Sequence, residues 1–184
     1  MYSPETILPT LEPRIGSWYL LVGPSIRLNT GLLQAIARFG ACAGVHVLDG
    51  GNRFDGYTLA RSARGSQEVL NRITVARAFT CYQLLALLES SPASPTPFVV
   101  LDLLRTFYDE SVPASERKRL LRACIVQLHR LRQAAGGLVS VHPPAIPSPT
   151  ALELLGLLQG AAADTLLVQP QAVSAPLPEQ MRLF

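Results

Sequence analysis

WYLLVGPSIRLNT, residues 18–30, is the stretch that decides how this chain folds. It opens with an apolar run that predicts a buried strand, and the segment after it resembles the phosphate-binding pattern G-x-x-x-x-G-K-[ST]. Gly23 and Thr30 match the two ends of that pattern. Leu28 stands in place of its second glycine, and Asn29 stands in place of its lysine. The segment therefore predicts a strand–loop–helix frame for a nucleotide site that lacks the cation for the β- and γ-phosphates.

The composition predicts one compact domain. The chain has 184 residues, of which 48% are hydrophobic and 16% are charged, and this is enough apolar material for a sizeable core. We expect a single domain over residues 1–184, with a core from 18 to 169, an N-terminal extension at 1–15 and a proline-rich tail at 170–184. No apolar run approaches the roughly 18 residues of a membrane span. The N-terminus lacks the layout of a signal peptide, so we expect a cytoplasmic protein without a membrane partner.

Charge and cysteine usage narrow the chemistry further. The net charge is a mild +3, and 15 of the 16 basic residues are arginine. Lys118 is the only lysine, so no neighbouring lysine can replace the missing one by a shift of register. The three cysteines form no C-x-x-C pair, which argues against a zinc site and predicts buried, reduced thiols at Cys42, Cys81 and Cys124.

Short apolar runs alternate with amphipathic segments along the chain. The predicted strands are Trp18–Val22, Val45–Asp49, Arg72–Ala76, Phe98–Asp102, Leu138–Val141 and Thr165–Val168. The predicted helices are Thr30–Phe39, Thr80–Glu89, Ser115–Ala134 and Pro149–Leu158. Such alternation indicates an α/β fold with a mostly parallel central sheet and helices on both of its faces.

Two carboxylates and a histidine close predicted strands, and ligands bind at such carboxyl ends in open α/β sheets. Asp102 follows the apolar run 98–101, as does the aspartate that holds magnesium in P-loop enzymes. Asp49 ends an earlier strand before a glycine-rich turn, and His142 ends a later strand. If magnesium binds with a nucleotide, its expected ligands are Thr30 and Asp102. The sequence does not establish a cofactor. If Mg-ATP binds, the full set of expected nucleotide contacts is Gly23, Arg27, Asn29, Thr30 and Asp102.

A series of motifs in a fixed order carries a family resemblance. The loop of residues 23–30 is followed by LDGGNRF at 48–54, RITVARAFT at 72–80, FVVLD at 98–102 and LVSVH at 138–142. From Leu20 to about Pro144, the chain resembles the core ATPase domain of RecA-like recombinases, especially the archaeal and eukaryotic branch and its paralogues. The resemblance implies a three-layer α/β/α RecA-like P-loop NTPase fold and a role in DNA recombination or repair. It also implies a RecA-like or other DNA-repair protein as partner, and the fold permits self-association into a ring or filament.

The chain departs from that family at three functional positions. Leu28 and Asn29 replace the Gly-Lys of the loop, the glutamate that activates water falls on Gly51, and the sensor glutamine falls near Pro143. Removing one oriented electrostatic group typically costs a few kcal/mol of transition-state stabilisation, so three such losses together predict a domain without turnover. We therefore expect a pseudo-ATPase that acts as a binding or scaffold partner.

Two alternative functions stay open on the sequence. The first is an ATP-binding protein or slow ATPase in which Arg27 replaces the loop lysine. The second is an arginine-rich nucleic-acid-binding module, because the predicted helix 115–134 carries basic side chains opposite its apolar stripe. The residues of that helix expected to contact DNA or a protein partner are Arg117, Arg119, Arg122 and Arg130.

Overall fold

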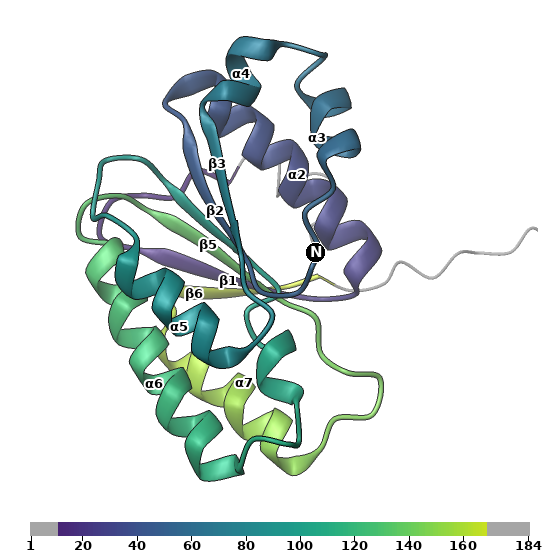
Figure 1. The fold of residues 1–184 in the computed structure, drawn as a ribbon, viewed down its shortest axis with the longest axis vertical. Coiled ribbons are helices and arrows are strands. Elements are labelled where there is room, and N and C mark those ends of the chain that lie inside the picture. The colour runs from purple at the N-terminus through teal and green to yellow at the C-terminus, as the bar shows by residue number, and fades with distance from the viewer. Residues whose placement is uncertain (1–10, 169–184) are drawn as a thin grey trace, which may run out of the picture.

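Six parallel strands form one central sheet in the order β3-β2-β4-β5-β1-β6 (Figure 1). The computed structural model describes residues 11–168, without the side chains of residues 25–27. The strands are β1 (Trp18–Val22), β2 (Val45–Asp49), β3 (Ile73–Arg77), β4 (Phe98–Leu101), β5 (Gly137–Val141) and β6 (Asp164–Leu167). Each predicted strand is present within one or two residues of its expected bounds. The expected α/β class with a parallel sheet is confirmed.

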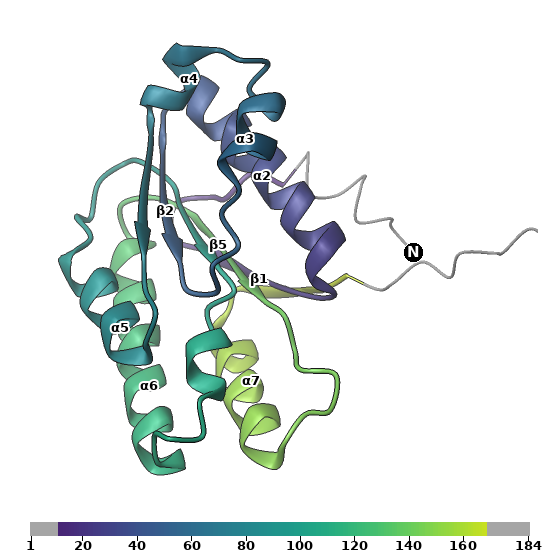
Figure 2. The same cartoon turned by 45° about the vertical axis from the view of Figure 1, so that its right-hand side comes forward.

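Helices cover both faces of the sheet, which gives three layers (Figures 1 and 2). One face carries α2 (Ser25–Cys42), α3 (Gly56–Ser62) and α4 (Gln67–Asn71). The other face carries α5 (Cys81–Ser90), the 3-10 turn η1 (Arg105–Tyr108), α6 (Ala114–Leu131) and α7 (Pro149–Ala161). No helix in the described part of the chain is long and apolar enough to span a membrane.

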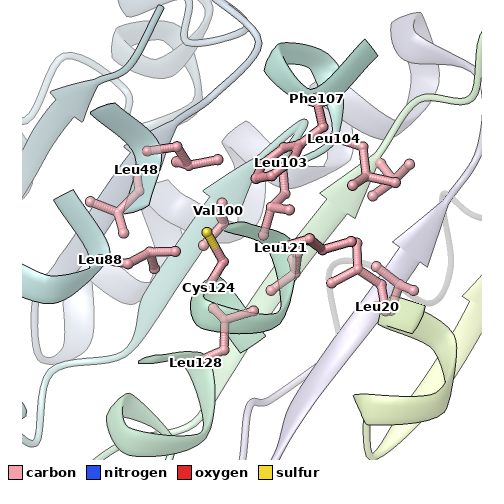
Figure 3. Close-up of a cluster of buried hydrophobic side chains, with 14 of the residues drawn as sticks. Leu20, Leu48, Leu88, Val100, Leu103, Leu104, Phe107, Leu121, Cys124 and Leu128 are labelled. Atoms are coloured by element: carbon pink, nitrogen blue, oxygen red, sulfur yellow. The ribbon is translucent and has the colours of Figure 1, made fainter. Parts of the chain in front are cut away.

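Each face of the sheet has its own hydrophobic core. Figure 3 shows the cluster between the sheet and α5, α6 and η1, in which Val100 of β4 lies among leucines from the helices and the thiol of Cys124. A second cluster lies between the sheet and α2. Cys81 and Cys124 are buried as expected, but Cys42 is exposed because it falls in the last turn of α2, away from the sheet. The expectation of three buried thiols was therefore wrong for Cys42.

The most consequential departure from expectation is the start of α2. This helix begins at Ser25 instead of the expected Thr30. Leu28, Leu32 and Ile36 are all buried, and their spacing of four residues extends one apolar stripe down to the first turn. The side chain at the missing glycine position thus belongs to the core, and its burial draws the residues of the expected loop into the helix.

The predicted chain ends lie mainly outside the described residues, which stop short of residues 1–10 and 169–184. Within the described part of the N-terminal extension, Leu11 packs against the core on the α2 face. The guanidinium of Arg38 donates a 2.7 Å hydrogen bond from Nη2 to the carbonyl oxygen of Leu11. Helices α3 and α4 were not predicted, because they are short and lack an apolar repeat long enough to recognise.

Candidate functional site

The connection from β1 to α2 is a tight turn in place of a phosphate-wrapping loop. Only Gly23 and Pro24 separate the strand from the helix, and the Leu28 amide already bonds back to the carbonyl of Pro24. A Cβ added at Gly23 would lie 2.5 Å from the carbonyl oxygen of Val168, so the glycine is needed for close packing against the strand end. A P-loop binds phosphate by turning successive amides inward, and this connection is too short to do so.

Asn29, at the position of the P-loop lysine, turns toward the segment after β2. Its side-chain Nδ2 donates a 2.9 Å hydrogen bond to the backbone carbonyl of Arg53. Its Oδ1 is buried and has no hydrogen-bond partner among the described residues. Thr30 follows on the same helix with an exposed side chain. Asn29 therefore links α2 to the loop that follows β2.

Asp102, the expected metal ligand, is completely buried just beyond β4. Its Oδ2 accepts a 3.0 Å bond from Nε of Arg53, and its Oδ1 accepts a 3.1 Å bond from the amide of His142. Its own amide donates to Oγ of Ser140, and its backbone adopts a left-handed conformation with φ of 51°. Both carboxylate oxygens are therefore engaged by groups of the chain itself.

Asp49 is held in the same way at the end of β2. Its oxygens accept bonds from the amides of Arg53 and Phe54 at 2.8 and 3.0 Å, and from Nε of Arg77 at 3.1 Å. Two buried carboxylates are thus each paired with an arginine that is about one-third exposed. Neither Arg53 nor Arg77 was predicted from the sequence as a site residue. The available signal was their position. Arg77 ends β3, whose neighbour β2 ends in Asp49, and Arg53 follows β2, whose neighbour β4 is followed by Asp102.

Gly51, the position of the water-activating glutamate, lies directly against Asp102. A Cβ at this position would be 2.4 Å from the Cβ of Asp102 and 2.7 Å from its Oδ2. Real Cβ atoms do not approach other heavy atoms this closely, so any side chain here would force Asp102 to move. The packing around Asp102 therefore leaves no room for a glutamate side chain at position 51.

These contacts join into one polar network along the carboxyl edge of the sheet. It runs from the carbonyl of Gly23 to the ring of His142 (3.0 Å to Nδ1), then through Asp102 and Arg53 to Asp49. Since Gly23 offers a carbonyl acceptor, Nδ1 of His142 is the donor of this hydrogen bond. The other ring nitrogen, Nε2, is buried without a hydrogen-bond partner among residues 11–168. The unpartnered Oδ1 of Asn29 at this edge is an acceptor, whereas a phosphate needs donors.

The arginines expected to form a nucleic-acid patch make different contacts. Arg117 is buried and donates from Nη1 to the carbonyl of Phe107 at 3.2 Å. Arg119 forms a two-pronged ion pair with Glu116, at 2.7 and 2.8 Å. Arg130 reaches across to the end of α5, where its Nη2 donates to backbone carbonyls including those of Leu88 and Ser91. Of the four, Arg122 is the exposed side chain for which the structure shows no such contact among the described residues.

An open cleft of about 500 Å³ lies beside Gly51, on the side away from α2. Its walls include Phe79, which is 71% exposed, and the turn η1 with Arg105 and Tyr108. Burial, together with the nearby carboxylate of Asp102, raises the pKa of Tyr108 well above its usual value, so this phenol stays protonated. The cleft is separate from the β1–α2 turn, where the sequence placed a nucleotide.

Comparison with known proteins supports the architecture. No family model matches the chain, and no curated protein matches its sequence. Among solved structures, the RadB recombinase matches with a TM-score of 0.58 over 87% of this chain and 77% of that chain, at 17% sequence identity. The fold is RecA-like. At this identity the likeness concerns the fold, and the expected three-layer RecA-like architecture is confirmed.

Proposed function

We propose that this chain is a catalytically deficient RecA-like domain that acts by binding a protein partner in DNA recombination or repair. The ion pair between Arg53 and Asp102 is the observation that supports catalytic deficiency. It places a cation of the chain itself on the carboxylate that would hold magnesium in a working site. The likeness to a recombinase fold supports a role in DNA recombination or repair.

Metal binding at Asp102 would require Arg53 to leave. The guanidinium is charged at any accessible pH, so it does not give way by deprotonation. Its removal would leave a buried carboxylate that only the amide of His142 still partners. Breaking a buried pair costs several kcal/mol, and because Arg53 is 33% exposed, solvent screening reduces this to about 2 kcal/mol. A magnesium nucleotide would have to overcome this cost without a loop lysine.

An orthodox phosphate cradle is also missing from the β1–α2 turn. Oδ1 of Asn29 is a buried acceptor here, and an acceptor repels phosphate oxygens. One feature favours a second candidate function, nucleotide binding or slow hydrolysis. The first turn of α2 carries no acidic residue, and Pro24 offers no capping side chain, so the amides at this helix end suit an anion.

Calorimetric titration with ATP and magnesium at millimolar concentration separates these functions. We expect no binding heat from the wild-type chain, and a dissociation constant in the micromolar range would overturn the proposal. The variant Arg53→Ala serves as a matched comparison, because it frees the carboxylate of Asp102. If the arginine blocks the site, magnesium binding should be stronger in this variant than in the wild-type chain.

The partner half of the proposal rests on surfaces that remain open. The outer edge of β3 has no neighbouring strand in the described part of the chain, and Val75 on it is 41% exposed. Such an edge can accept a strand from a RecA-like partner or from a second copy. Affinity purification from the native cell with quantitative cross-linking tests this. Recovery of neither a recombinase, a repair protein nor a second copy would count decisively against it.

A further inference from the structure

A groove of about 390 Å³ runs between α2 and the pair α3–α4, on the face opposite the α6 arginines. Figures 1 and 2 show these three helices together on one side of the sheet. Its walls contain small side chains, with Ala37 and Ala41 one helical turn apart on α2 and Ala63 across from them. Small side chains on both walls let another backbone approach closely. Arg38 and Arg64 also line the groove.

The chain segment that forms the groove is rich in arginine. From Arg27 to Arg77 the chain has seven arginines and three carboxylates, whereas the rest of the chain has nine basic residues and ten carboxylates. The net positive charge of the protein therefore originates in this segment. Several of its charges are paired, as in Arg53 with Asp102, Arg77 with Asp49, and Arg72 with Glu68.

The two arginines of the groove lack such neutralisation. Arg38 bonds to the neutral carbonyl of Leu11 and lies 5.2 Å from the ring centroid of Phe39, and neither contact cancels its charge. Arg64 is exposed and has no carboxylate within ion-pair distance among the described residues. Its backbone is left-handed, with φ of 53°, in a turn that glycine or asparagine would adopt more easily. Holding an arginine there costs free energy, which points to a use for its side chain.

We propose that this groove binds an acidic amphipathic helix of a partner protein. The apolar stripe of that helix lies against Ala37, Ala41 and Ala63, and its carboxylates reach Arg38 and Arg64 at the rim. An amphipathic helix laid into a groove is a recurring mode of recognition, in which apolar contacts supply affinity and flanking charges fix the register. This interaction rests on the partner-binding half of the proposed function and adds a second surface, because it uses neither the carboxyl edge of the sheet nor the edge of β3.

The groove suits a peptide better than nucleic acid. Nucleic acid needs a continuous track of cations for its phosphates and aromatic side chains for its bases. Here an alanine-lined stretch separates the two arginines, and no aromatic residue lines the groove. A second copy of the chain is also a weaker candidate, since like charges would face each other across a two-fold interface.

Fluorescence anisotropy with a labelled helical peptide tests the proposal. The acidic probe is about 15 residues long and has a stripe of leucine and alanine flanked by glutamates. The glutamine probe has the same sequence with every glutamate replaced by glutamine. We expect the acidic probe to bind at least several-fold more tightly than the glutamine probe, and its affinity to fall as salt is added.

Charge reversal at the groove locates the site. The substitution Arg64→Glu should weaken binding of the acidic probe on the order of tenfold, since it removes one attraction and adds one repulsion. Arg122→Glu is the matched control, because this exposed arginine lies on α6 at the other face of the sheet, and it should leave the affinity unchanged. Urea unfolding of both variants checks that the fold is intact.

Several outcomes would overturn the proposal. One is that the acidic probe does not bind up to millimolar concentration. Another is that the glutamine probe binds as tightly as the acidic probe, and a third is that Arg64→Glu and Arg122→Glu lose the same affinity. The groove would be reassigned to nucleic acid if a single-stranded oligonucleotide bound more tightly than the acidic probe and if Arg64→Glu weakened that binding. Concentration-dependent dimerisation abolished by the same substitution would reassign it to a second copy. Binding at the groove can fail while the nucleotide titration still supports the proposed function, so the two are tested separately.

Discussion

A single methyl group at Gly51 should destabilise this protein more than its small size suggests. In Gly51→Ala the new Cβ would lie 2.4 Å from the Cβ of Asp102 and 2.9 Å from its Cγ. Asp102 cannot yield easily, because Arg53 and the amide of His142 hold its two oxygens. Overpacking of a fixed interior site typically costs 1–3 kcal/mol, and the close contact with a completely buried, fully bonded residue puts this case at about 3 kcal/mol.

Urea denaturation monitored by fluorescence of Trp18 measures this cost. With a slope of about 2 kcal/mol per molar, the unfolding midpoint should fall by roughly 1.5 M. Gly156→Ala is the matched control, because a Cβ at that exposed position in α7 meets no atom within 4 Å, and it should stabilise the chain by about 0.5–1 kcal/mol. Gly51→Glu should be at least as unstable as Gly51→Ala and should hydrolyse no ATP. A midpoint for Gly51→Ala equal to that of the wild type would refute the reasoning.

Three further predictions concern other parts of the chain. Arg130→Ala should lower the free energy of unfolding by about 1–3 kcal/mol, because the carbonyls at the end of α5 lose their donor. Arg119→Ala, measured alongside, should leave the urea midpoint nearly unchanged, because the ion pair of Arg119 with Glu116 is exposed. Burial lowers the pKa of His129, so the unfolded chain binds its proton more readily, and stability should fall as the pH drops through about 6.5. His129→Gln should flatten that part of the pH profile, and an unchanged profile would contradict the assignment. Iodoacetamide at about pH 8 should label Cys42 of the folded protein first, as read by mass spectrometry, because burial raises the pKa of Cys81 and raises that of Cys124 to about 12. Faster labelling of Cys124 would show that α6 opens.

Most of the architecture was predictable because its signals are local. Near-continuous apolarity in Phe98–Leu101 marks a strand buried on both faces, and its burial is complete in the structure. The long amphipathic stripe of α6 likewise identifies a helix on the sheet. Helices α3 and α4 escaped prediction because their caps, Asp55 and Ser66, are meaningful only when a helix is already suspected.

The candidate site was only half predictable. The sequence placed Asp102 at a strand end and Gly51 at the glutamate position, and both lie at the carboxyl edge as expected. It proposed Arg27 as the cation of the site, and nothing local pointed to Arg53. The pairing of Arg53 with Asp102 joins residues far apart in the chain, so it depends on the placement of β2 beside β4.

The sequence alone determined the class of fold and the absence of three functional groups, because strand–helix alternation and residue identity are properties of the chain itself. Only the tertiary structure decided what replaced those groups. Packing against the sheet turned the expected phosphate loop into the first turn of α2 through Leu28. The parallel order of the strands then brought Arg53 to Asp102 and Arg77 to Asp49. The sequence gives the residue at each motif position, whereas the neighbouring strands determine which side chains fill the space around it.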